Sequence, residues 1–189
     1  MNLLTKTTAL CLIGTASLAG DYEDAMQAYL DAHVASWATD ATLIDAIIAQ
    51  NTANAGLTQA DIDALDLAWR AEVGAADTPT ITPVLSNPAS DRLRAISAES
   101  GGAVTEIFIM DMHGLNVATS DVTSDYWQGD EAKFIETYGV GPGAVHFSEV
   151  ELDESTQTYQ AQISVTIVAP DTGDLIGAMT VGVNAESLM

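Results

Sequence analysis

The pattern of hydrophobic and polar positions changes character about halfway along the chain. Over residues 21–54, after residue 58 and again after residue 88, apolar residues recur at the three- and four-residue spacing of an amphipathic helix. From residue 104 onward apolar and polar residues tend to alternate, which is the pattern of strands with one buried face. The pattern therefore predicts a layer of helices followed by an antiparallel sheet, an α+β fold.

Local signals place the ends of the predicted helices. Residues that accept hydrogen bonds from the first turn of a helix precede each apolar stretch, and glycines follow two of them. The expected caps are Asp40, Thr58 and either Ser86 or Asn87, and the expected stops are Gly56 and the pair Gly101–Gly102. Thr58 and Asp61 have the spacing of a capping box. A long N-terminal helix and shorter helices are expected before the sheet.

The second half is expected to form five strands. The predicted strands are 104–111 and 115–120, which form a first hairpin, 145–152 and 158–168, which form a second, and a last strand at 175–183. Residues 107–110 and 175–183 are apolar at successive positions, so these strands should lie in the middle of the sheet. In 158–168 the side chains expected to face the core are Tyr159, Ala161, Ile163, Val165 and Ile167. A short helix is expected at 130–138.

The first 19 residues have the pattern of a secretory signal peptide. Lys6 precedes an apolar run from residue 8 to residue 18, and Ser17-Leu18-Ala19 provides small residues for cleavage before Gly20. This pattern predicts export to the periplasm, with an uncleaved N-terminal anchor as the alternative. No later stretch approaches the roughly 20 apolar residues of a membrane span.

Cysteine content and net charge limit the kinds of site and partner that the protein can have. The one cysteine, Cys11, lies inside the predicted signal, so the mature chain is expected to have neither disulfides nor thiol chemistry. The full chain carries 27 acidic residues against 5 basic ones, a formal net charge of -22. Binding to nucleic acids or anionic membranes needs basic clusters, so both classes of partner are excluded.

The stretch from residue 106 to residue 134 is the most informative part of the sequence. Two apolar strands flank the turn Asp111-Met-His-Gly114, and a polar loop with two aromatic rings follows at 120–129. Together with the later hairpin and IGAMTVGVN at 176–184, this stretch of sequence resembles the single-Cache (PDC-type) family of extracytoplasmic sensor domains. The resemblance implies one non-catalytic domain, with a helical layer at 20–103 and a five-stranded, PAS-like antiparallel sheet at 104–189.

The resemblance also implies where a ligand would bind, between the sheet and the loop and helix that follow its first strands. Tyr126 and Trp127 lie in that loop and are expected to enclose the ligand, although the two rings would also serve to plug the end of the core. Lys133 and Arg92 are the candidate partners for an anionic group, with surface ion pairs as the alternative. Asp111 is the candidate partner for a ligand ammonium, or else it caps the hairpin turn.

Other kinds of site receive less support from the residues. Asp121, Asp125 and Asp130 offer oxygen ligands in one loop, but their spacing differs from that of an EF-hand. The three histidines are scattered, and the sequence contains no HExxH or GxSxG motif. We therefore expect no enzyme activity, cofactor or metal.

The expected function is that of an exported sensor module for a small polar metabolite, a carboxylate or an amino acid. Because no membrane span or output segment follows the last strand, the module is expected to present its ligand to a partner receptor or transporter in the membrane. Two alternatives remain, a Ca²⁺-binding structural or adhesion module and a protein-binding accessory subunit of a membrane receptor.

Overall fold

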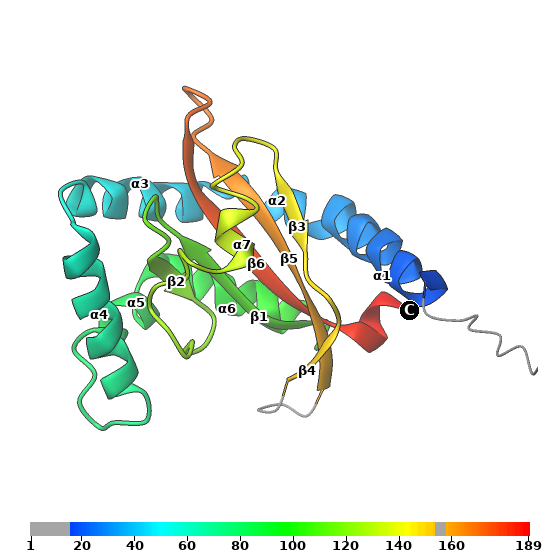
Figure 1. Ribbon diagram of the computed structural model, residues 1–189, viewed down its shortest axis with the longest axis horizontal. Coiled ribbons are helices and arrows are strands. Elements are labelled where there is room, and N and C mark those ends of the chain that lie inside the picture. Colours follow the sequence, from blue (N-terminus) through cyan, green and yellow to red (C-terminus); the bar gives the residue numbers. More distant parts are fainter. Residues whose placement is uncertain (1–15, 154–157) are drawn as a thin grey trace, which may run out of the picture.

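The computed structural model describes residues 16–153 and 158–189, and it has helices in its first half and an antiparallel sheet in its second (Figure 1). The predicted α+β fold is confirmed. Residues 1–15 of the predicted signal peptide and residues 154–157, the predicted tip of the second hairpin, lie outside the described residues. The division at residues 103 and 104 stays a prediction. Among the described residues, no helix combines the length and the apolar character needed to cross a membrane.

The helices follow the predicted caps. They are α1 (Ala16–Tyr29), the π-helical turn η1 (Leu30–Val34), α2 (Ala35–Trp37), α3 (Ala41–Asn54), α4 (Gln59–Glu72), α5 (Ile81–Leu85), α6 (Pro88–Glu99), α7 (Ala132–Ile135) and the 3-10 turn η2 (Ala185–Leu188). The Asp40 side chain accepts a hydrogen bond from the backbone N–H of Thr42, and Thr58 and Asp61 form the predicted capping box. Asn87 caps α6, which has Pro88 in its first turn.

The local differences from the prediction concern short elements. The connector after residue 78 contains α5, and the first helical segment contains the π-turn. The helix expected at 130–138 is a single turn, α7. The strand expected at 145–152 is divided, because Ser148–Val150 leave strand geometry between β3 and β4.

The sheet is antiparallel throughout. Its strands are β1 (Val104–Met110), β2 (Asn116–Thr119), β3 (Val145–Phe147), β4 (Glu151–Asp153), β5 (Thr158–Val168) and β6 (Leu175–Asn184). The order is β2-β1-β6-β5-β3, and β4 pairs with the far end of β5. As predicted, β1 and β6 each have a neighbour on both sides.

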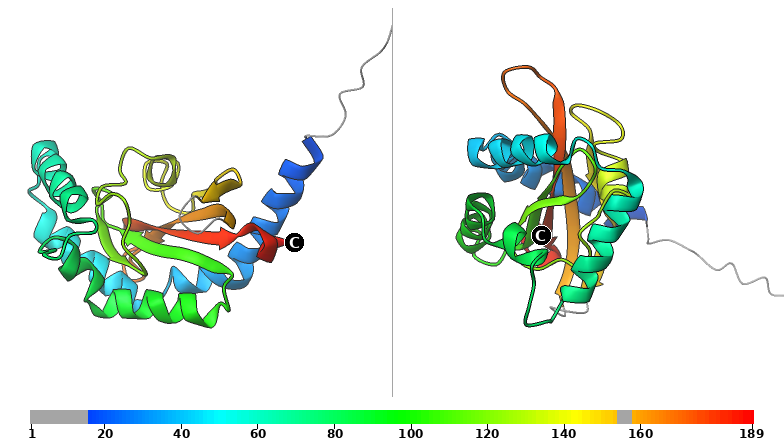
Figure 2. Two further views of the ribbon diagram at one scale, coloured as in Figure 1. Left: turned by 90° about the horizontal axis from the view of Figure 1, so that it is seen from below. Right: turned by 90° about the vertical axis from the view of Figure 1, so that its left-hand side faces the viewer.

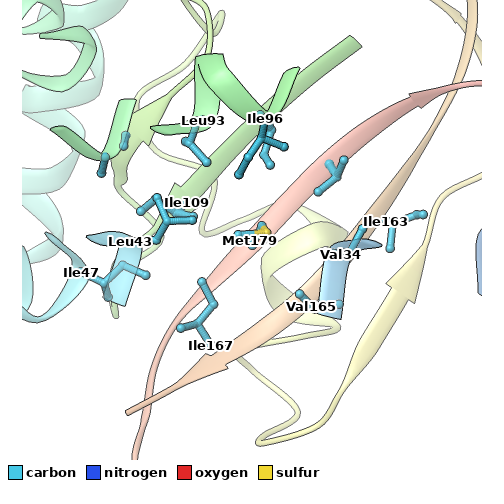
Figure 3. Close-up of a cluster of buried hydrophobic side chains, with 14 of the residues drawn as sticks. Val34, Leu43, Ile47, Leu93, Ile96, Ile109, Ile163, Val165, Ile167 and Met179 are labelled. Atoms are coloured by element: carbon cyan, nitrogen blue, oxygen red, sulfur yellow. The ribbon is translucent and has the colours of Figure 1, made fainter. Parts of the chain in front are cut away.

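Helices α3 and α6 cover one face of this sheet, which we call the inner face, and α7 with its flanking loops lies on the other, the outer face (Figure 2). Helix α4 stands at the end of the sheet beyond β2 (Figure 1). The core on the inner face joins strands β1, β5 and β6 to α3, α6 and η1 (Figure 3). Its labelled members include Val34, Leu43, Ile47, Leu93, Ile96, Ile109, Ile163, Val165, Ile167 and Met179, all buried. Apolar surface buried in this layer is the main source of stability.

Tyr159 corrects the predicted core. Its side chain is 60% exposed, whereas Ala161 and Ile163 on the same strand are fully buried. Tyr159 pairs with Leu152 of β4, which is 46% exposed. The predicted alternation in β5 is therefore right, but among the described residues no element packs over the inner face at this end of the β4–β5 hairpin.

Candidate functional site

The outer face of the sheet is polar where three strands meet. Gly182 of β6 lies in register between Glu106 of β1 and Gln162 of β5. Because glycine has no side chain, the two neighbours meet above it, and Gln162 Nε2 donates a hydrogen bond of 2.8 Å to Glu106 Oε1. A Cβ at Gly182 would lie 2.5 Å from Thr105 Oγ1 and 2.7 Å from Glu106 Cγ, so a side chain here would displace the residues that form this floor.

The loop between β2 and α7 rises above the floor and forms a cavity of about 480 Å³. The lining residues come from the sheet, the loop and α7: Glu106, Phe108, Val122, Thr123, Ser124, Asp125, Gln128, Glu131, Lys133, Gln160 and Gln162. A second hollow of about 260 Å³ adjoins it and shares Glu131, Lys133, Gln160 and Gln162. We call the larger hollow the Lys133 cavity.

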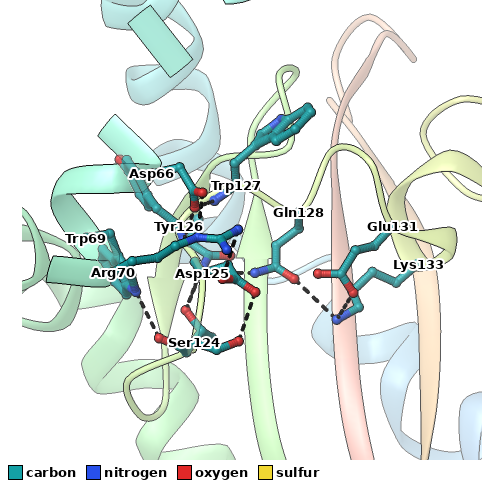
Figure 4. Close-up of polar contacts among 12 residues, drawn as sticks. Asp66, Trp69, Arg70, Ser124, Asp125, Tyr126, Trp127, Gln128, Glu131 and Lys133 are labelled. Atoms are coloured by element: carbon teal, nitrogen blue, oxygen red, sulfur yellow. Dashed lines mark hydrogen bonds and ion pairs between the residues drawn. The ribbon is translucent and has the colours of Figure 1, made fainter. Parts of the chain in front are cut away.

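Lys133 supplies the one positive charge in the described lining of this cavity. Its side chain is 14% exposed, and its ammonium lies 2.9 Å from Glu131 Oε2 and 3.2 Å from Gln128 Oε1 (Figure 4). The ammonium also lies 5.4 Å from the centre of the Phe108 ring, in the range of a cation–π contact. An ammonium has three N–H donors, so among the residues that the structure describes one donor remains beyond these two oxygen partners.

The loop that covers the cavity is fixed to α4 through Asp66. The Asp66 carboxylate accepts hydrogen bonds from the backbone N–H groups of Tyr126 (2.9 Å) and Trp127 (3.1 Å) and forms an ion pair of 2.7 Å with Arg70. Arg70 also forms an ion pair of 3.0 Å with Asp125 (Figure 4). Charge-assisted hydrogen bonds of this kind hold the loop against a helix that lies about 60 residues earlier in the chain.

The two aromatic rings of the loop lie behind it and do not line the cavity. The ring of Tyr126 stacks on that of Trp69 with a centroid separation of 5.0 Å and an interplanar angle of 5°, and burial followed by the charge of Asp111 raises the pKa of Tyr126 to about 12. Trp69 Nε1 donates to the carbonyl of Thr123, and Trp127 Nε1 donates to that of His113, each at 2.8 Å.

Asp111 is fully buried in the hairpin turn and is not part of the cavity lining. It accepts hydrogen bonds from the backbone N–H groups of His113 and Leu115 at 2.9 and 3.0 Å, and from the side chains of Gln50 and Asn54 at 3.0 and 2.8 Å. Four donors satisfy the buried carboxylate. It therefore closes the turn and ties β1 to α3.

Arg92 lies on the helical side of the molecule. Its Nε is 2.7 Å from Asp40 Oδ2, so the arginine joins α6 to the cap of α3. Burial acts to raise the pKa of Asp40, but the hydrogen bonds from Arg92 and from the Thr42 backbone outweigh it and lower the pKa. Of the five residues predicted for the ligand site, the structure brings Lys133 to this cavity and places the other four in supporting contacts elsewhere.

The residues that sequence reasoning missed are Glu106, Phe108, Gln160, Gln162 and Gly182. The alternation in β5 indicated that Gln160 and Gln162 face away from the core. The alternation gave no indication that Gln162 would contact Glu106 of β1 across Gly182, because this contact depends on the register of three strands.

The acidic loop does not gather into a metal cluster. Asp125 pairs with Arg70, and Asp121 accepts a hydrogen bond from the N–H of Val122. Within residues 16–153 and 158–189, no group of three or more histidine, cysteine or acidic side chains is arranged to hold a metal ion.

Comparison with known proteins finds similarity at the level of structure. No protein-family model matches the chain, and no curated protein matches it. The sensor domain of the histidine kinase DctB from V. cholerae matches 91% of this chain with a TM-score of 0.49 and 17% identity. The ligand-binding domain of the Campylobacter jejuni chemoreceptor Tlp3, solved with 4-methylisoleucine, matches 93% with a TM-score of 0.42 and 13% identity.

The E. coli DcuS sensor domain matches 67% of this chain with a TM-score of 0.39 and 16% identity. The protein spans 55% of the DctB chain, 65% of the Tlp3 chain and 92% of the DcuS chain. The structural matches, which extend over most of the chain, are to sensor domains of the Cache (PDC) type that the sequence resemblance predicted.

Proposed function

We propose that this protein is an exported, periplasmic ligand-binding sensor module that binds a small carboxylate or amino acid in the Lys133 cavity. The observation that carries the proposal is the Lys133 ammonium, which lines the cavity with one N–H donor beyond its two oxygen partners. In this proposal Tyr126, Trp127 and Asp66 hold the covering loop in place and do not contact the ligand.

The size and charges of the cavity support an amino acid in particular. A volume of about 480 Å³ falls within the 300–1,000 Å³ that is usual for small-molecule sites. A ligand carboxylate would take the remaining donor of Lys133. A ligand ammonium would be attracted to Glu106, because the hydrogen bond from Gln162 uses one of its two carboxylate oxygens.

Such a ligand would connect two parts of the molecule. Lys133 belongs to α7 at the end of the loop, whereas Glu106 belongs to the sheet. A molecule that bridges them makes contacts that exist only when the loop region is closed, so binding shifts the population toward the closed form. We propose that a membrane receptor or transporter recognises this form.

The test is a thermal-shift screen of amino acids, carboxylates, amines and divalent cations, followed by calorimetric titration of any hit. Lys133→Met keeps the length and apolar stem of the side chain and removes its charge. We expect this variant to bind about tenfold to hundredfold more weakly, which is the range for losing a charge-assisted hydrogen bond. Arg94→Gln, which removes a cation paired with Asp91 on α6, is the matched control and should bind as the wild type does.

Three outcomes separate the proposal from its rivals. A hit that survives Lys133→Met but is lost in Arg92→Gln would move the site to the helical side. A melting temperature that responds to Ca²⁺ and chelator alone would favour the structural or adhesion module. A protein that responds to no compound yet is retained with a membrane receptor would favour the accessory subunit.

A further inference from the structure

Another hollow lies on the helical side of the molecule, across the sheet from the Lys133 cavity. It has a volume of about 320 Å³ and lies between the first helical segment and the end of α6. The lining residues are Tyr29, His33, Trp37, Ile96, Glu99, Ser100 and Ala103. We call it the aromatic cavity. It shares no lining residue with the Lys133 cavity.

Three aromatic rings form one wall of this cavity. The ring centroids of Tyr29 and His33 are 4.7 Å apart, and those of His33 and Trp37 are 6.0 Å apart. The ring centroids of Tyr29 and Trp37 are 6.4 Å apart with an interplanar angle of 72°, an edge-to-face arrangement. The wall therefore presents electron-rich ring faces in two steeply inclined orientations.

The π-turn brings these rings onto one side of the helix. In a regular α-helix a step of four residues advances about 40° around the axis, so residues 29 and 37 would be about 80° apart. The π-turn at Leu30–Val34 holds more residues per turn and reduces that offset. Single π-turns inside helices are frequent at functional sites.

The opposite wall carries negative charge. Glu99 is exposed and makes no ion pair or hydrogen bond within the part of the chain that the structure describes. α6 ends at Glu99, so the negative end of a 12-residue helix also lies at this wall. The two cations of α6, Arg92 and Arg94, are engaged by Asp40 and Asp91.

The remaining lining is small or apolar. Ile96 is buried beneath the cavity, and Ala103 adds a second apolar side chain. A bare metal ion prefers several charged or carbonyl oxygen ligands, whereas the side chains of this lining offer one carboxylate, that of Glu99, and the hydroxyls of Ser100 and Tyr29. A positive charge surrounded by methyl groups, in contrast, suits all parts of this lining. Its methyl groups can contact the ring faces and the apolar floor, and its charge is attracted to the rings and to the carboxylate.

We propose that the aromatic cavity is a second ligand site, which takes a quaternary or multiply methylated ammonium group. The ring faces of Tyr29 and Trp37 contact the methyl groups, and Glu99 with the end of α6 supplies the long-range attraction. The site is independent of the function proposed for the Lys133 cavity.

The probes are choline and tetramethylammonium, titrated into the full protein by calorimetry at constant ionic strength. The neutral isostere 3,3-dimethylbutan-1-ol has the shape of choline without the charge. We expect choline to bind and the alcohol to bind at least about tenfold more weakly, since the cation–π and carboxylate contributions vanish with the charge. Equal binding of the two compounds, or no choline binding at millimolar concentration, overturns the proposal.

Variants locate the binding. Trp37→Leu keeps an apolar side chain without an electron-rich face, and Glu99→Gln keeps the shape of the rim without its charge. Each should weaken choline binding several-fold, whereas Lys133→Met should leave it unchanged. If Trp37→Leu fails to fold, His33→Ala provides the test of the aromatic wall from an exposed position. Choline binding that is lost in Lys133→Met but retained in Glu99→Gln and in the aromatic variant overturns the assignment to this cavity.

Discussion

The inner and outer faces of the sheet are built by the same strands and differ in what they contact. On the inner face, side chains of β1, β5 and β6 are apolar and closed over by helices. On the outer face the same strands carry Glu106, Gln162 and the buried hydrogen-bonded pair Ser164 and Thr180. The alternation of a strand thus places core packing and the lining of the Lys133 cavity one residue apart. Neighbouring residues in β5 can be changed to measure each separately.

The largest effect is expected from such a pair of neighbours. Ile163 is fully buried in the inner core, and Gln162 lines the Lys133 cavity. Ile163→Ala should lower the free energy of unfolding by about 2–5 kcal/mol, because it leaves a cavity in a packed core. Gln162→Ala should lower it by about 1 kcal/mol or less while weakening ligand binding. Denaturant unfolding of the two variants measures both free energies. Similar losses of stability in the two variants would contradict the proposed difference between the faces.

The next effect concerns the loop above the outer face, where Tyr126 is buried against Trp69. Burial, with the charge of Asp111, raises the pKa of Tyr126 from an ordinary 10.0 to about 12. A raised folded pKa gives stability that is complete below pH 10 and is lost as the pH rises from 10 to 12. Tyr126→Phe should therefore change little at neutral pH.

The same variant should be more resistant than the wild type to alkaline unfolding, by up to about 2–3 kcal/mol near pH 12. Urea unfolding of both proteins at a series of pH values measures the difference. Parallel curves from pH 8 to pH 12 would show that the ring ionises in a solvated position and that the loop is less firmly held than the structure indicates.

The smallest effect is expected at the rim of the inner face. Arg92→Gln removes the ion pair with Asp40 and should cost about 0.2–1 kcal/mol at neutral pH, as is usual for a partly exposed pair. Because the folded pKa of Asp40 is lowered, the pair stabilises the protein above the ordinary value of 3.8 and loses its effect as the pH falls through the folded pKa. Wild type and variant should therefore converge in melting temperature on acidification.

Features that depend on neighbouring residues were predictable from the sequence. The caps act within one helical turn. Asp40 and Thr58 occur as predicted, and Asn87 is one of the two residues predicted to cap α6. The buried face of β5 followed from its alternation, except at Tyr159, where burial depends on whether another element reaches that far.

The site depended on contacts between distant segments and was predicted only in part. Lys133 was recognised because it is one of few cations, and it lines the cavity. Tyr126 and Trp127 were recognised as rings in a polar loop, but their partner Asp66 lies 60 residues away on α4, and the sequence gives no sign of that pairing. The floor at Gly182 depends on strand register, and the π-turn has no sequence signal that we recognised.

The position of β6 has a consequence for how the chain folds as it is made. β6 pairs with β1 over residues 178–183 and with β5 over residues 175–184, although about 70 residues separate β1 from β6 in the sequence. At ribosomal rates of roughly 5–20 residues per second, β1 and its hairpin wait several seconds before their central neighbour has been synthesised. Until then the edges of β1 and β5 that pair with β6 have no partner strand. The nascent chain therefore stays without a closed core during that interval, and its apolar strands remain exposed to chaperones.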